Sequence, residues 1–398
     1  MKDYLTTPKG TRDILLEERE TQSWIEGQLE SVFRSYGYHP VITPGIEYLD
    51  VYAAAPGNVG SEHMFKLIDN EGRILVLRPD STAPIARLVA SRLQGSAKPV
   101  RLYYNQRVYR QKDLYSGHRI ETSQMGVELI GANSMRADME MLQLAMDTLE
   151  GCGMTDYRIE LGHGGLCELL LAQLAAEDSV KEQLRQWIQA KNYPALNDFL
   201  DTMGTGEDIR AIRALPGLFG GREVLDQAAD IWNKPETSAI IDYTRSLFDA
   251  LIALGMQDKL MLDLGFVNDN DYYTGIIFQA YIPGSGEAVL LGGRYDHLLA
   301  RFGETLPAVG FGVNVDLLTK SRMDEGAQVQ VQPSDALVWG EAGYGVQGMR
   351  YADTLRRTEG FVVENGLFEQ LDQCVAYAQA RGIKRIHVVG QHVKVIDI

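Results

Sequence analysis

The sequence predicts an α+β protein: an antiparallel sheet flanked by helices, with a helical insertion and a small C-terminal α/β domain. Two segments with strand periodicity and a central turn, 101–131 and 272–293, are typical of antiparallel hairpins. Between them, residues 163–257 carry apolar residues at helical spacing, which favours an inserted helical block. Residues 335–398 alternate between strand and helix patterns, as a separate small domain would.

The length and composition allow more than one core. The chain has 398 residues, of which 45% are hydrophobic, enough for two or three cores. Its formal net charge is −16, and no run rich in Lys or Arg interrupts the acidic composition. Nucleic-acid binding depends on clustered cations, so we expect no nucleic-acid partner.

The cysteines and the N-terminus bear on the compartment. Cys152, Cys167 and Cys374 stand in no metal-ligand spacing, which predicts reduced thiols rather than disulfides or a metal site. The N-terminal sequence MKDYLTT lacks the features of a signal peptide, and no apolar run is long enough to span a bilayer. We therefore expect a cytoplasmic protein with no metal and no membrane contact.

The N-terminal part begins with a predicted helix that ends at Gly37. Its apolar residues at helical spacing are Ile25, Leu29, Val32, Phe33 and Tyr36. A strand leading to Pro44 follows, and then a hairpin that turns at 69–72. A second helix is expected to begin at Ser81, with Pro84 in its first turn.

The hairpin at 101–131 has one polar face. Strand periodicity places Gln124, Gly126 and Glu128 on that face and the apolar residues between them on the other. Arg110 arrives from the preceding strand. The pattern fits either a polar floor that grips a small zwitterion or an amphipathic surface sheet whose polar side faces water.

The insertion is predicted to contain four helices, at 166–176, 180–190, 223–232 and 237–254. We expect it to be a structural cap, because no catalytic constellation occurs in it. His163, just before the first of these helices, is either a group at the edge of a pocket or a loop histidine.

A polar linker, 321–334, separates the core, 1–320, from the small domain, 335–398. The small domain is predicted to be a βαβαβ unit with elements at 335–339, 346–357, 361–364, 367–381 and 385–389. Its helices are acidic, which argues against an RNA-binding surface.

Several motifs resemble those of class II aminoacyl-tRNA synthetases, in the form found in histidyl-tRNA synthetase. The segment VYRQKDLYSGHRIETSQMGVELIG, 108–131, is similar to motif 2. PKGTRDIL near the N-terminus, Pro44 of motif 1, LRPDSTA and NDYYTGIIFQAY match further signatures of that family. The resemblance implies a class II synthetase-like fold and a homodimer formed through motif 1.

The resemblance also implies a pocket for histidine. The family's histidine-binding positions are occupied here by Asp80, Thr82, Arg110, Gln124, Glu128, Tyr272 and Tyr273. Glu128 and the two tyrosines would surround the imidazole, which offers one donor and one acceptor when neutral. Asp80, Thr82 and Gln124 would hold the amino group, with Arg110 near the carboxylate. Alternatively, Asp80 and Thr82 are N-caps in a relic pocket whose polar groups satisfy one another.

Three departures fall on positions that handle ATP in the synthetases. Asn268 stands where the family has its catalytic arginine, Leu317 where motif 3 has an arginine, and Lys112 where motif 2 has an acidic residue. An amide next to Asp269 and Asp271 is a poor replacement for a cation, because adenylate formation places negative charge on the α-phosphate.

A synthetase-like chain that keeps an amino-acid pocket and loses its nucleotide chemistry is similar to the regulatory subunits of ATP phosphoribosyltransferase. This resemblance implies a subunit with no catalytic residues, cofactor or metal, which activates the short catalytic subunit in the first step of histidine biosynthesis. It further implies a hetero-octamer with that subunit, histidine as the feedback effector, and no tRNA partner. The alternatives are an active, divergent histidyl-tRNA synthetase and an amino-acid sensor with another partner.

Overall fold

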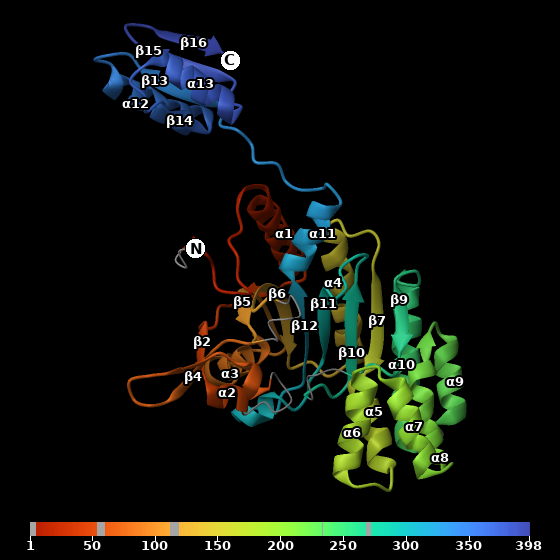
Figure 1. Ribbon diagram of the computed structural model, residues 1–398. Coiled ribbons are helices and arrows are strands. Elements are labelled where there is room, and N and C mark those ends of the chain that lie inside the picture. Colours follow the sequence, from red (N-terminus) through yellow and green to blue (C-terminus); the bar gives the residue numbers. More distant parts are fainter. Residues whose placement is uncertain (1–4, 54–59, 112–118, 233, 268–271) are drawn as a thin grey trace. The chain divides into compact units, whose positions relative to one another are not determined.

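A computed structural model of the chain describes residues 5–53, 60–111, 119–232, 234–267 and 272–398. The chain divides into two compact units, Met1–Gln328 and Val329–Ile398 (Figure 1). The predicted fold class is confirmed: an antiparallel sheet flanked by helices, a helical insertion and a small C-terminal α/β unit. Within the described ranges, no helix is long and apolar enough to cross a membrane.

A nine-stranded sheet forms the centre of the first unit, in the order β1-β5-β6-β12-β11-β10-β7-β9-β8. Neighbouring strands run antiparallel except in the β1–β5 and β7–β9 pairs. The strands are β1 (His39–Pro40), β5 (Val100–Tyr109), β6 (Glu121–Ile130), β7 (Arg158–His163), β8 (Phe219–Gly220), β9 (Leu260–Asp263), β10 (Ile276–Tyr281), β11 (Leu290–Arg294) and β12 (Ala308–Asn314). Both predicted hairpins are confirmed, as β5–β6 and β10–β11.

One face of this sheet is covered by three helices (Figure 1), namely α1 (Leu16–Ser35), α4 (Met135–Gly151) and α11 (Val315–Asp324). The predicted apolar stripe of α1 points inward, because Leu29 and Phe33 are fully buried in the same core as Val127 and Leu129 of β6. Burying one side chain of this size stabilises the fold by about 1.5–3 kcal/mol. After α1 the chain turns at Gly37, whose φ of 78° lies in the left-handed region that glycine favours.

The other face of β5 and β6 is covered by α3 and its neighbours, with Ile85 and Val89 buried against the side of the sheet that carries Leu102 and Tyr104. This layer contains β2 (Ile46–Tyr48), α2 (Leu49–Ala53), η2 (Ser61–His63), β3 (Lys66–Ile68), β4 (Ile74–Leu77), α3 (Thr82–Arg92) and η5 (Leu299–Phe302). The hairpin predicted around 69–72 is confirmed as β3–β4. The helix predicted to begin at Ser81 is α3, and Ser81 is its N-cap residue.

Among its described residues, the insertion holds six α-helices where four were predicted. They are α5 (Gly164–Gln173), α6 (Asp178–Gln189), α7 (Tyr193–Met203), α8 (Glu207–Ala214), α9 (Glu223–Ile231) and α10 (Pro235–Ala253), with η4 (Leu215–Gly217) after α8. The two helices absent from the prediction are α7, on which Leu196 and Leu200 are buried, and α8, on which Ile209, Ala211 and Ile212 are buried. Helix α7 is capped by Asn192, whose side chain accepts a hydrogen bond from Ala195 N–H at 3.3 Å.

The second unit contains the five predicted elements and one additional strand. Its elements are β13 (Ala336–Gly340), α12 (Gly345–Thr354), a π-helical turn η6 (Leu355–Glu359), β14 (Val363–Asn365), α13 (Leu371–Arg381), β15 (Arg385–Val389) and β16 (Val393–Asp397). The sheet order is β14-β13-β15-β16, with β16 antiparallel to β15. The strand β16 is mostly exposed and pairs on one side only, so its sequence lacks the apolar run of a core strand.

Candidate functional site

The polar face of β6 forms a floor together with its neighbours on the sheet. Glu128 lies beside Leu102 of β5 and Gly310 of β12, while Gln124 lies beside Asn314 of β12. On the opposite face, the apolar residues of β6 are buried in the main core. The predicted alternation of faces along β6 is therefore confirmed.

Glycines on this floor give the polar side chains room to lie across the sheet. A Cβ at Gly312 would lie 2.8 Å from Gln124 Nε2, and a Cβ at Gly310 would collide with the carboxylate of Glu128. A Cβ at Gly126 would press on the Tyr104 hydroxyl. Side chains at these positions would displace the polar groups, because buried groups have no free space to move into.

Glu128 lies at the buried end of the site and is 2% exposed. The Thr82 hydroxyl donates a hydrogen bond to Glu128 Oε1 at 2.8 Å, and the Tyr295 hydroxyl donates to Oε2. Burial raises the pKa of Glu128 to about 8, although both hydrogen bonds favour the ionised form. Glu128 is therefore largely protonated at neutral pH in the unliganded protein.

Asp80 and Arg110 form the opposite wall. Asp80 is 5% exposed, and its Oδ1 accepts a hydrogen bond from Ala83 N–H at 3.2 Å, in the first turn of α3. Burial raises the pKa of Asp80 to about 6, and the charge of Arg110 opposes that rise. Arg110 Nε donates to the carbonyl of Pro79 at 2.9 Å, which fixes the guanidinium at the end of β5.

Aromatic rings close the site on the side of β10 and β11. The rings of Tyr272 and Tyr273 lie 4.8 Å apart between centroids, and Tyr272 meets Tyr295 edge to face at 5.6 Å. Such geometries are favourable for aromatic pairs and hold the rings in fixed orientations. The result is a partly aromatic wall around the carboxyl group of Glu128.

All seven residues named from the sequence line one cavity of about 50 Å³. Its lining residues are Asp80, Thr82, Tyr104, Arg110, Gln124, Glu128, Tyr272, Tyr273, Leu291, Tyr295, Gly310, Phe311 and Gly312. Tyr104 and Tyr295 also line the cavity and were not predicted from the sequence. Tyr104 could have been found, because it has the same strand parity as Gln106 and pairs with Gly126.

The cavity opens into a larger groove of about 850 Å³, which shares Arg110, Gln124, Leu291 and Gly312 with it. Leu317, in the first turn of α11, lines this groove where the synthetase motif has an arginine. The two other departures, Lys112 and Asn268, lie outside the described residues, as do Asp269 and Asp271.

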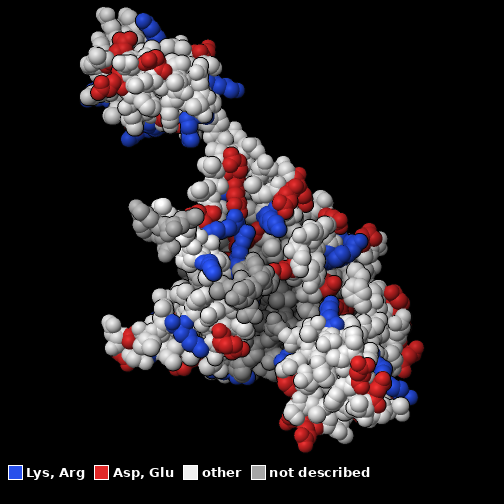
Figure 2. All heavy atoms as spheres, in the orientation of Figure 1, with Lys and Arg blue, Asp and Glu red and all other residues white. Residues whose placement is uncertain are grey.

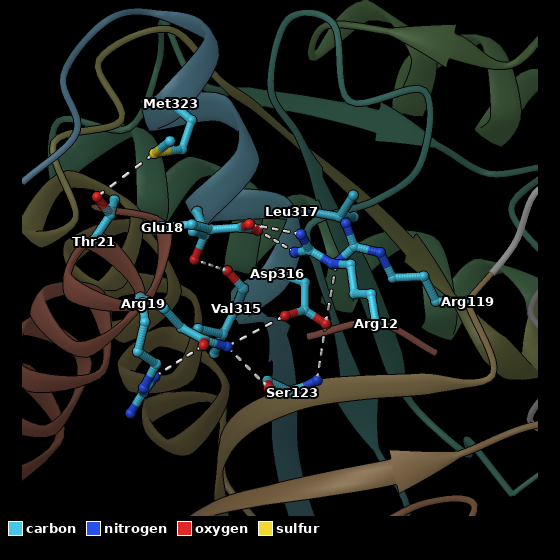
Figure 3. Close-up of polar contacts among 12 residues, drawn as sticks. Arg12, Glu18, Arg19, Thr21, Arg119, Ser123, Val315, Asp316, Leu317 and Met323 are labelled. Carbon is cyan, nitrogen blue, oxygen red and sulfur yellow. Dashed lines mark hydrogen bonds and ion pairs between the residues drawn. The ribbon is translucent and has the colours of Figure 1, made fainter. Parts of the chain in front are cut away.

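A carboxylate stands beside Leu317 at the edge of the groove (Figure 3). Asp316 Oδ2 accepts a hydrogen bond from Ser123 N–H at 3.1 Å and lies 3.6 Å from Arg119. At the other side of the groove, Lys191 lies 3.7 Å from Asp263. Both cations therefore have an internal counter-ion, which reduces the positive potential that a polyphosphate would need.

His163 was expected to be either a pocket-edge group or a loop histidine, and the loop interpretation is wrong. It is the last residue of β7, and its Nδ1 accepts a hydrogen bond from Gly165 N–H at 3.2 Å as the N-cap of α5. Burial lowers the pKa of His163 to about 4, which keeps this acceptor unprotonated. Among the described residues, no group of three or more His, Cys, Asp or Glu side chains could hold a metal ion.

The fold and the lining of the cavity define a class II aminoacyl-tRNA synthetase-like protein. Residues 10–318 match the family described as Histidyl-tRNA synthetase. ATP phosphoribosyltransferase regulatory subunits are similar to this chain over nearly their full length. The subunit of Clostridium kluyveri is 34% identical, and the match covers 96% of this chain and 98% of the relative. The subunit of Geobacter sulfurreducens is 36% identical, and the match covers 96% of this chain and 88% of the relative. The chain belongs to this family of regulatory subunits, which is related to histidyl-tRNA synthetase.

Solved structures agree with this assignment. An ATP phosphoribosyltransferase regulatory subunit/histidyl-tRNA synthetase from Bacillus halodurans superposes with a TM-score of 0.85 at 29% identity, covering 97% of this chain and 99% of that one. A histidyl-tRNA synthetase from Nostoc sp. PCC 7120 has a TM-score of 0.78 at 20% identity, covering 98% and 94%, and shows the shared fold alone.

Proposed function

We propose that this chain is a non-catalytic regulatory subunit of ATP phosphoribosyltransferase in the cytoplasm, which activates the short catalytic subunit and mediates feedback by histidine. The observation that carries the proposal is the contrast between two adjoining sites. The cavity is lined by the seven residues that the resemblance assigns to amino-acid binding, with Asp80 in place of the family's glutamate, whereas the groove next to it has Leu317 in place of a cation. Such a protein can bind an amino acid without activating it.

The chemistry of the cavity suits histidine. Glu128, protonated at neutral pH, offers a donor and an acceptor to a neutral imidazole, and the rings of Tyr272 and Tyr273 supply an aromatic wall. An ammonium group placed near Asp80 would favour its ionised form and hence lower its pKa from about 6. Thr82 and Gln124 would complete the amino-group site, and Arg110 would hold the carboxylate.

The lost chemistry is adenylate formation. Its transition state gains negative charge on a phosphate, and removing one electrostatic partner of such a charge typically costs about 3–4 kcal/mol. Leu317 offers no charge, and two of the four cations that line the groove, Arg119 and Lys191, are each within 4 Å of a carboxylate of the chain itself. On the face drawn in Figure 2, acidic side chains stand among the basic ones, which suits the proposed absence of a tRNA partner.

Aminoacylation remains the second candidate, because the family match to histidyl-tRNA synthetases spans residues 10–318 and the residues that the resemblance assigns to the amino acid line one cavity. It requires cations at the positions now held by Leu317 and Asn268. The two functions therefore differ in one measurable reaction, the histidine-dependent exchange of pyrophosphate into ATP.

The proposed assembly is a homodimer through the region between Ser23 and Pro44, and a hetero-octamer with the short catalytic subunit. Within this region, Ile42 is a large apolar side chain that is 82% exposed. Exposed apolar side chains of this kind are available for a protein–protein contact. The inner face of α1 is buried in the chain's own core, so the dimer contact would use the outer face of the helix.

Mixing this chain with a short ATP phosphoribosyltransferase catalytic subunit tests the proposal. We expect a single larger species in size-exclusion chromatography and a turnover that rises when this chain is added. If the elution volume and the turnover are those of the separate proteins, the proposed partner is wrong.

A further inference from the structure

The helical insertion begins in direct contact with the cavity. Where β7 passes into α5, Gly164 N–H donates a hydrogen bond to the carbonyl of Gly275 at 2.8 Å. The next residue, Gly165, donates to His163 Nδ1 at 3.2 Å. The first turn of α5 is therefore fixed onto the segment that follows Tyr273, one of the two cavity tyrosines.

Tyr273 is confined between α5 and β11. A Cβ at Gly164 would lie 3.0 Å from both the Cβ and the carbonyl oxygen of Tyr273. On the other side, a Cβ at Gly293 would lie 2.7 Å from Tyr273 Cδ1. A side chain at Gly293 would collide with the tyrosine, and one at Gly164 would press on it. Close packing of this kind transmits displacement instead of absorbing it.

A second connection joins the insertion to the cavity through α10. The Tyr243 hydroxyl of α10 donates to Asp138 Oδ2, and Asp138 Oδ1 accepts from Arg294 Nε at 2.9 Å. Asp138 is fully buried and Arg294 is 5% exposed. Arg294 is followed by Tyr295, which donates to Glu128. A buried and fully paired charge holds its elements in one arrangement, because separating the pair would leave an isolated charge.

We propose that the insertion changes position when a ligand binds in the cavity, and so passes the regulatory signal on. Helices α5 and α10 of the insertion set the positions of Tyr273 and Arg294, and a ligand that moves these residues moves the insertion. The proposal rests on the proposed function, since it takes histidine as the ligand. It replaces the expected role of the insertion as a structural cap. The coupling is reciprocal, so a change on α5 must alter ligand affinity.

Two matched variants of the full chain test this coupling. Gly164→Ala adds a methyl group that presses on Tyr273, whereas Gly165→Ala adds one whose nearest neighbours are at 3.5 Å, an ordinary contact. Both substitutions favour the helix to the same degree. By calorimetry we expect Gly164→Ala to weaken histidine binding about fivefold or more, and Gly165→Ala to stay within about twofold of wild type.

Hydrogen exchange of the insertion provides the second readout. Histidine is expected to slow exchange in α5 and α10 of the wild-type chain, and Tyr243→Phe, which keeps the ring and removes its hydrogen bond, is expected to reduce the effect in α10. Equal histidine affinity in the two alanine variants, with no change of exchange in the insertion, overturns the coupling but leaves the proposed function intact. Failure of the wild-type chain to bind histidine overturns both.

Discussion

The Thr82 hydroxyl donates a hydrogen bond to Glu128 Oε1 at 2.8 Å, and so ties the first turn of α3 to the middle of β6. The second donor to this carboxyl group is the Tyr295 hydroxyl. Neither donor carries a charge, so they cannot offset the burial that raises the pKa of Glu128 to about 8. This neutral carboxyl group sets the chemistry and the pH response of the cavity.

The pH dependence of stability follows from Glu128. Its pKa is higher in the folded chain than in the unfolded one, where it is about 4.3. The folded state therefore binds more protons between these values, and stability contributed by the protonated group is lost as pH rises toward and through about 8. Glu128→Gln keeps a neutral group, so the melting temperature should fall less between pH 6 and 9 than that of wild type. An equal fall in melting temperature between pH 6 and 9 in the two proteins would contradict the raised pKa of Glu128.

Tyr295→Phe removes a buried donor and leaves Glu128 Oε2 without it. We expect a loss of about 1–3 kcal/mol in the free energy of unfolding, measured by urea denaturation at pH 7. Tyr103→Phe is the matched control, because the Tyr103 hydroxyl donates to Glu30 at a carboxylate that water can reach. If Tyr295→Phe loses no more unfolding free energy than this control, the hydrogen bond from Tyr295 to Glu128 does not stabilise the fold.

Asp138→Ala leaves Arg294 without its principal buried partner. Breaking a buried ion pair by removing one member typically costs about 3–5 kcal/mol, and that loss of unfolding free energy is expected here. In contrast, Asp353→Ala breaks the exposed pair with Arg357 and should cost at most about 0.5 kcal/mol. Chemical denaturation of both variants checks the difference, and similar costs would mean that the Asp138 network does not hold α10 to the sheet.

Histidine-dependent exchange of pyrophosphate into ATP should be absent in this chain. The physical reason is the neutral Leu317 beside the groove, where an unpaired cation is needed for the phosphate charge of the transition state. A histidyl-tRNA synthetase assayed in parallel is the positive control. Exchange well above background would favour the divergent synthetase over the regulatory subunit.

The elements that could be predicted from the sequence are those with a complete buried face. Periodicity sufficed for α1 and for the β5–β6 hairpin, because each buries one complete face in the main core. The prediction did not include α7, α8 or β16, and β16 is mostly exposed, so it has no buried face that an apolar pattern could mark.

In the cavity, the motifs named seven lining residues but not Tyr295, whose role arises only when β11 brings its hydroxyl to Glu128 across the sheet. The ion pairs of the groove, Arg119–Asp316 and Lys191–Asp263, could not be predicted from the sequence either, because each joins residues far apart in the chain.

The central claim is that this cavity senses histidine on behalf of a catalytic partner. Its most direct test is the inhibition by histidine of ATP phosphoribosyltransferase complexes reconstituted with wild type or with Glu128→Ala. Loss of a buried hydrogen-bonding partner of the imidazole should cost about 1.5–3 kcal/mol, so the variant complex should remain active but need at least about tenfold more histidine. Inhibition of both complexes at the same histidine concentration would contradict the claim and assign feedback to another site.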